Sequence, residues 1–171
     1  SDLRRLMHEV KDSKQATVRI SYDGKVHKTF RGPLARRRFD NEVRVLRYLE
    51  KQNCPFVPRV LSTDPEKLSM VTTNCGSIVD KIGQDKLDHL FRELEQYGVR
   101  HSDPYTRNVT YSADLGRFCL IDFEFALILE SGEGFSLEEL EEINKEDRNV
   151  KALRELEAIE RENREKNKGE R

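Results

Sequence analysis

The segment from His101 to Glu124 constrains this chain more than any other part of it. Asp103 and Asn108 stand five positions apart in a stretch rich in turn-forming residues. A second aspartate, Asp122, follows directly after the apolar run at 118–121. Residues 109–111 and 118–121 are typical of two strands joined by a turn, so a β-hairpin would bring Asp122 back beside the loop.

These side chains, taken together, suit phosphoryl transfer. Asp103 would orient and deprotonate an attacking hydroxyl, while the amide oxygen of Asn108 and the carboxylate of Asp122 would hold Mg²⁺ against nucleotide phosphates. Each aspartate taken alone would equally suit a turn or a helix cap. The ordered set favours the catalytic interpretation over these structural ones.

The pattern His-x-Asp-x-x-x-x-Asn, followed by Ile-Asp-Phe-Glu, resembles the protein-kinase-like superfamily. It is most similar to the small divergent branches: RIO-type kinases, KEOPS-complex kinases and aminoglycoside phosphotransferases. The resemblance covers roughly residues 13–130 and implies a minimal two-lobe α+β fold. We expect a core over 1–135, with a small lobe of antiparallel sheet and one helix at about 13–73. A reduced helical lobe that carries the catalytic-loop hairpin would follow at about 77–135.

The resemblance also assigns a nucleotide-anchoring ion pair. Lys28, on a strand expected over 25–30, matches the lysine that binds α- and β-phosphates. Glu42, on a helix expected over 35–51, matches its ion-pair partner. The alternative is a surface lysine and an exposed glutamate, with Lys25 as the competing anchor.

Further assignments fall on the segment between the lobes and on the loop histidine. Thr72, Thr73 and Asn74 lie where backbone groups would contact adenine, and Gly76 would give the chain freedom there. His101 matches a histidine that packs and hydrogen-bonds rather than reacts.

Three departures from the kinase pattern weaken the expectation of catalysis. Residues 11–17 contain no glycine, so Lys14 and backbone N–H groups would have to meet the phosphates without a Gly-rich loop. The Asp-Phe-Gly motif reads Asp122-Phe-Glu124, which removes a hinge and adds a negative charge. Most of the large lobe is also absent.

Periodicity supplies the remaining elements. Residues 2–12 would form a short helix or a poorly ordered lead-in. We expect strands at 16–22, 25–30, 60–61 and 68–73, and helices at 35–51 and 83–98, the last ending at Gly98.

The composition sets limits on compartment and metal chemistry. Cys54, Cys75 and Cys119 show no C-x-x-C spacing, so we expect no zinc site or disulfide framework and place the chain in the reducing cytoplasm. No apolar run reaches 18 residues, so we expect no membrane span.

Charge is divided unevenly along the chain. Residues 1–60 hold 15 Lys and Arg against 7 Asp and Glu, while residues 61–171 hold 16 against 25. The basic run Arg36-Arg37-Arg38 would attract nucleotide phosphates or RNA. We favour a solvated helix face, because the aromatic residues of a base-stacking surface are missing.

Residues 136–171 form a charged segment with a different character. Leucine, isoleucine and valine recur at spacings of three among dense Glu, Lys and Arg, which predicts a helix or helix pair that packs on the core or binds a protein partner. We expect it to fray into disorder after about Arg161.

The expected function is therefore an ATP- and Mg²⁺-dependent phosphotransferase. It would pass the γ-phosphate to a hydroxyl of a protein, of a small molecule or of itself, and the sequence does not select among these acceptors. The alternative is a pseudokinase that serves as a nucleotide-binding or protein-interaction module, which the missing glycines and the shortened lobe favour.

Overall fold

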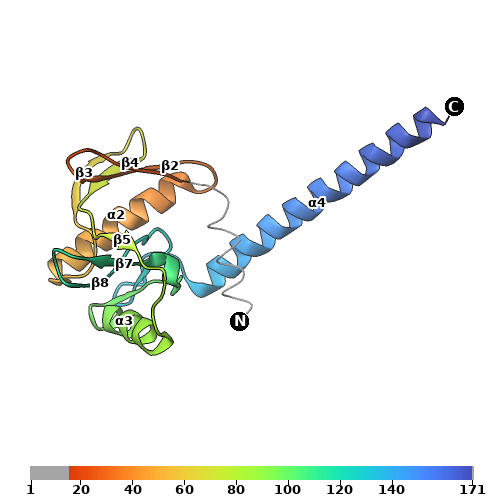
Figure 1. The fold of residues 1–171 in the computed structure, drawn as a ribbon. Coiled ribbons are helices and arrows are strands. Elements are labelled where there is room, and N and C mark those ends of the chain that lie inside the picture. Colours follow the sequence, from red (N-terminus) through yellow and green to blue (C-terminus); the bar gives the residue numbers. More distant parts are fainter. Residues whose placement is uncertain (1–15, 171) are drawn as a thin grey trace. The chain divides into compact units, whose positions relative to one another are not determined.

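The computed structural model describes residues 16–170. This part of the chain is a mixed α+β structure of three α-helices and antiparallel sheets (Figure 1). It divides into two compact units, with the boundary after Ser136. The expected helix at 2–12 and the glycine-free segment up to residue 15 lie outside the described residues.

A four-stranded antiparallel sheet begins the first unit. Its strand order is β1-β2-β4-β3, and the strands are β1 (Ala16–Ile20), β2 (Val26–Phe30), β4 (Ser69–Thr72) and β3 (Val60–Asp64). The turn between β1 and β2 contains Gly24 at a φ of 82°, a conformation that favours glycine. The expected hairpin is therefore present, although β1 ends two residues earlier than the alternation predicted.

Helix α2 (Ala35–Lys51) packs against this sheet. Its apolar positions Phe39, Val43, Leu46 and Leu49 recur every three or four residues and are all buried, as the helical spacing predicted. Phe39 meets Phe30 of β2 edge to face, with ring centroids 5.8 Å apart. This contact fixes α2 beneath the sheet.

The rest of the first unit is built from α3 and short strands. The elements are β5 (Ser77–Ile78), α3 (Gln84–Gln96), β6 (Val99–Arg100), a 3-10 turn at Thr106–Asn108, β7 (Val109–Ser112), β8 (Arg117–Leu120) and β9 (Leu127–Ile128). They pair as β5-β7-β8 and β6-β9. The predicted β7–β8 hairpin is present, with Val109 opposite Leu120.

Gly98 follows the C-terminal end of α3 in a left-handed conformation. Its φ is 93°, and a Cβ at this position would lie 2.7 Å from the Tyr48 hydroxyl oxygen. The prediction that α3 closes at Gly98 is therefore correct, since the left-handed backbone conformation there favours glycine.

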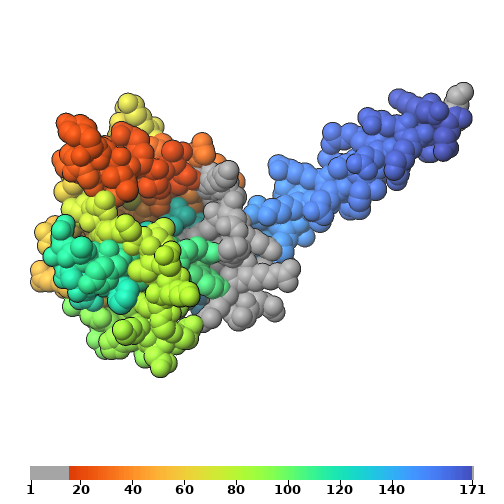
Figure 2. All heavy atoms as spheres, in the orientation of Figure 1, coloured from red at the N-terminus to blue at the C-terminus, as the bar shows by residue number. Residues whose placement is uncertain are grey.

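The second unit contains α4 (Leu137–Gly169), a single continuous helix. Leu140 is fully buried, whereas the expectation that the aliphatic residues of this segment are covered by the core fails for the distal half, and partner binding stays a prediction. Val150, Leu153, Leu156 and Ile159 are all exposed. They belong to the part of α4 drawn in blue in Figure 2. The helix is not split into a pair, and it continues past Arg161, where we expected fraying. Among residues 16–170, no helix combines the length and the apolar character needed to cross a membrane.

Candidate functional site

Lys28 lies on the buried face of β2. Val26, Lys28 and Phe30 alternate onto one side of the strand, and Lys28 pairs with Met70 of the neighbouring strand β4. The predicted register is therefore correct. Lys25 belongs instead to the exposed turn, where its ammonium lies 3.5 Å from Asp23.

Helix α2 brings Glu42 to this lysine. The Lys28 Nζ lies 2.8 Å from Oε1 of Glu42, and both side chains are buried. The second carboxylate oxygen of Glu42 accepts a hydrogen bond from the backbone N–H of Phe123. Glu42 therefore joins the sheet, α2 and the segment that follows β8.

The Asp-Phe-Glu segment supplies two further carboxylates. Asp122 Oδ1 lies 3.0 Å from Lys28 Nζ, and Glu124 Oε2 lies 3.9 Å from it. Glu124 also lies 3.2 Å from Nη1 of Arg38, whose side chain is 0% exposed. Lys28 and Arg38 thus form one cluster with the carboxylates of Glu42, Asp122 and Glu124. With all five side chains ionised, the cluster carries a net charge of −1.

Burial and the neighbouring charges shift the pKa values of Lys28 and Glu42. Burial acts to lower the pKa of Lys28, but the carboxylates of Asp122, Glu42 and Glu124 outweigh it and raise that pKa above its usual value. Burial raises the pKa of Glu42 to about 6, opposed by Lys28 and assisted by the other two carboxylates. Lys28 is therefore held firmly as a cation.

Asp122 differs from its neighbours in conformation and exposure. Its φ is 70°, a left-handed value that aspartate tolerates better than most residues. Its side chain is 29% exposed, whereas that of Glu42 is buried. Of the carboxylates that contact Lys28, Asp122 is thus the most accessible to a bound ligand.

The loop before β7 forms a second polar group. Asp103 is completely buried, and Nη2 of Arg107 lies 2.9 Å from its Oδ1. The Nδ2 group of Asn108 donates to the backbone oxygen of Asp103 at 2.8 Å and also to its carboxylate. The amide nitrogen of Asn108 is therefore committed to Asp103, so its amide oxygen is the atom suited to a cation.

Asn108 and His101 hydrogen-bond this loop to Ile121, the residue before Asp122. The Asn108 carbonyl accepts the Ile121 N–H at 3.0 Å. His101 Nε2 lies 2.8 Å from the Ile121 carbonyl, and its Nδ1 accepts the Asp103 N–H. The His101 ring also packs against Phe91 and Phe123. These contacts give His101 the positioning role that the sequence predicted.

The segment after β4 is held by hydrogen bonds to Arg59 and Thr110 and by one bond within itself. Thr72 is buried and pairs with Val26, which puts it on the same face as Lys28. Thr73 exchanges hydrogen bonds with Arg59, and Asn74 Oδ1 accepts the Gly76 N–H. A Cβ at Gly76 would lie 1.9 Å from the Tyr111 carbonyl, so close packing rather than hinge freedom requires this glycine.

An exposed apolar strip lies on the same face as Lys28. Val18 is directly opposite Lys28, and Ile20 is opposite Val26 across the β1–β2 pairing. Paired residues of an antiparallel sheet point to the same side. Val18 is 58% exposed and Ile20 is 63% exposed, so this part of the sheet offers an apolar surface beside the lysine.

Arg38 and Arg107 are residues of these clusters that the sequence patterns did not identify, and the pairing of Arg38 with Glu124 was not expected either. The interpretation of Arg36–Arg38 as a solvated face is wrong for Arg38, which is fully buried and paired with Glu124. The helical spacing could have identified it, since Arg38 lies one turn before Glu42. Arg37 stacks on Phe135, with the guanidinium 4.1 Å from the ring centroid.

The donor set constrains the metal chemistry. Residues 16–170 contain no group of three or more His, Cys, Asp and Glu side chains able to hold a metal ion. Asn108 and Asp122 offer one amide and one carboxylate, which fits Mg²⁺ bound together with nucleotide phosphates rather than an all-protein metal site. The three cysteines are free and buried.

Comparison with known proteins does not identify the chain. No protein-family model and no curated protein sequence matches it.

Proposed function

We propose that the chain is an ATP- and Mg²⁺-dependent phosphotransferase with a kinase-like two-lobe arrangement. The observation that carries the proposal is the position of the Lys28 ammonium, 2.8 Å from Glu42 and 3.0 Å from Asp122. Strand β2 thus supplies Lys28, helix α2 supplies Glu42, and the segment after β8 supplies Asp122, so that the three side chains meet. The β1-β2-β4-β3 sheet with α2 would be the small lobe, and α3 with the β7–β8 hairpin would be the reduced large lobe.

Each polar residue has a defined role in this proposal. Lys28, oriented by Glu42, would bind the α- and β-phosphates, while Asn108 and Asp122 would hold the metal. Bound MgATP supplies the transferable γ-phosphoryl group and the charge neutralisation that transfer requires. Asp103 would orient the acceptor hydroxyl and take its proton, with Arg107 and Asn108 fixing its carboxylate.

The adenine ring needs an apolar surface and backbone contacts. Val18 and Ile20 offer exposed apolar area on the Lys28 face, and Thr72 lies on the same face. We place the adenine beside this strip, close to the segment formed by Thr72, Thr73 and Asn74. The free buried cysteines suit the cytoplasmic location that goes with this function.

A second function, that of a nucleotide-binding or protein-interaction module without catalysis, rests on Arg107 and Glu124. The Arg107 guanidinium contacts both Asp103 oxygens, and a paired carboxylate is a weaker base. Glu124 replaces the hinge glycine and is fixed by Arg38. Both features suit a site that binds without turnover.

A phosphotransfer assay separates the two functions. The wild type, Asp103→Asn and Arg107→Gln would be incubated with γ-labelled ATP and Mg²⁺, with a protein, a small-molecule panel or the chain itself as acceptor. Transfer by the wild type that is lost in Asp103→Asn supports the enzyme. No transfer to any acceptor, with MgATP binding intact, supports the module.

A further inference from the structure

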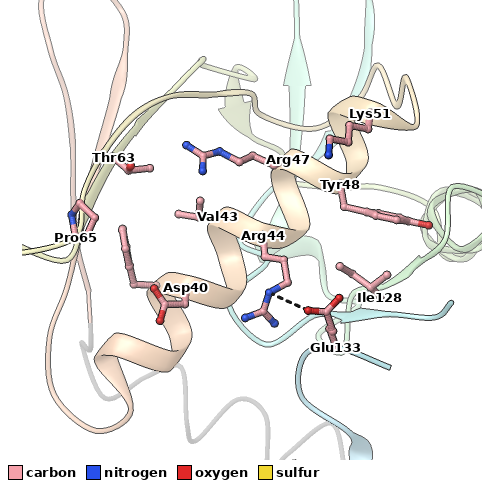
Figure 3. Close-up of a pocket in the computed structure, with 11 residues that line it drawn as sticks. Asp40, Val43, Arg44, Arg47, Tyr48, Lys51, Thr63, Pro65, Ile128 and Glu133 are labelled. Atoms are coloured by element: carbon pink, nitrogen blue, oxygen red, sulfur yellow. Dashed lines mark ion pairs between the residues drawn. The ribbon is translucent and has the colours of Figure 1, made fainter. Parts of the chain in front are cut away.

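The outward face of α2 borders a groove that is separate from the Lys28 cluster. It has a volume of about 500 Å³ and lies between α2, β3 and the segment after β9 (Figure 3). Its α2 lining runs from Phe39 to Lys51, and a helix of this length rises about 18 Å. The groove is therefore far longer than one phosphate or carboxylate group.

The floor of the groove is apolar. Phe39, Val43 and Ile128 line it, and each of them belongs to the buried core. Pro65 closes the side formed by the β3–β4 turn. Phe39, Val43 and Ile128 are already almost fully covered, so a ligand in the groove would bury only the small apolar area that they leave accessible.

The two ends of the groove differ in charge. Arg47 and Lys51 are exposed, lie one turn apart and reach towards the β3 side of α2 (Figure 3). Neither has an ion-pair partner within residues 16–170, and two like charges at this helical spacing repel each other. At the other end, Asp40 adds a negative charge, and Arg44 is paired with Glu133 at 3.5 Å.

We propose that this groove binds a short acidic peptide segment of a partner protein. Carboxylates of the peptide would lie against Arg47 and Lys51, with its apolar side chains on Phe39, Val43 and Ile128. An extended peptide of about five residues spans the groove at about 3.3 Å per residue. The carboxylates of Asp40 and Glu133 would repel a nucleic acid, because the phosphates of its backbone would place negative charge along the whole groove.

Three labelled hexapeptides test the proposal by fluorescence anisotropy with the full chain. The first, Glu-Glu-Leu-Phe-Gly-Lys, has an acidic end, an apolar middle and a basic end. The second replaces both Glu residues by Gln, and the third replaces Leu-Phe by Ser-Ser. Only the first is expected to bind well, with each control weaker by about tenfold.

Matched protein variants locate the binding. Arg47→Gln/Lys51→Gln should weaken the first peptide by about tenfold, and Lys81→Gln/Arg92→Gln, which removes two exposed charges elsewhere, should not. Circular dichroism checks that both double variants are folded. Absence of binding to the wild type, equal binding of the control peptides, or unchanged affinity of the groove variant overturns the proposal.

Discussion

The ammonium of Lys28 lies 3.0 Å from a carboxylate oxygen of Asp122, although 94 positions separate the two residues in the chain. The contact joins the four-stranded sheet to the segment that follows the β7–β8 hairpin. Glu42 reinforces this junction, because its carboxylate contacts Lys28 and also accepts a hydrogen bond from the backbone N–H of Phe123.

Replacing Lys28 should damage the fold far more than replacing Lys25. Lys28→Met leaves buried Glu42 and Glu124 without their shared cation, which should cost about 3 kcal/mol or more of unfolding free energy. Lys25→Met removes an exposed turn charge and should change stability by less than about 0.5 kcal/mol. Chemical denaturation of the two variants measures the difference, and equal effects would contradict the assigned strand register.

Glu42 should make stability depend on pH in a defined window. Its pKa rises from 4.5 in the unfolded chain to about 6 in the folded state, chiefly through burial. Between these values the folded state binds more protons than the unfolded state, so the Glu42 contribution to stability is present at pH 4.5 and lost as the pH rises through 6. The loss should be about 2 kcal/mol.

Denaturation curves at several pH values across this window, with Glu42→Gln as the comparison, measure that loss. The amide that this substitution introduces cannot titrate, so the variant should lack this component of the pH dependence. Parallel curves for the two proteins would exclude Glu42 as its source.

Glu124 should matter for stability more than Asp122 does. Glu124→Gln removes the carboxylate beside the fully buried Arg38 and should cost about 2 kcal/mol or more. Asp122→Asn relieves a cluster with excess negative charge and keeps a side chain that tolerates the positive φ, so its effect should stay within about 0.5 kcal/mol. A larger loss for Asp122→Asn in thermal denaturation would reverse this order.

Truncations of α4 should separate its buried and exposed parts. Removing residues 148–171 takes away side chains that are exposed throughout 148–170, and it should change the unfolding free energy by less than about 0.5 kcal/mol. Removing residues 136–171 also takes away Leu140, which should cost about 1.5–3 kcal/mol. Equal melting temperatures for the two truncated chains would show that Leu140 contributes nothing.

Local patterns predicted much of the fold. The alternation of Val26, Lys28 and Phe30, the helical spacing of α2 and the glycine that closes α3 each act over a few residues and can be read directly. Asp103 and Asn108 are linked by a hydrogen bond within one short loop, so their spacing already predicted that the two side chains lie together.

Long-range charge pairing could not be predicted in the same way. Arg38 looked like part of an exposed basic run, and it is buried only because Glu124 arrives from a segment 86 positions away. The distal aliphatic residues of α4 posed the opposite problem. Their spacing of three drifts around the helix, so no single face forms, and periodicity alone could not show whether they are covered.

Binding of MgATP tests the central claim most directly. Thermal denaturation of the wild type and of Asp122→Asn would be measured with ATP plus Mg²⁺ and with ATP plus EDTA. We expect the melting temperature of the wild type to rise with MgATP and much less with ATP and EDTA, because bound ligand stabilises the folded state. Asp122→Asn should lose the Mg²⁺-dependent part of the rise. No rise for the wild type at millimolar nucleotide, or an equal rise in Asp122→Asn, would contradict the proposed phosphotransferase site.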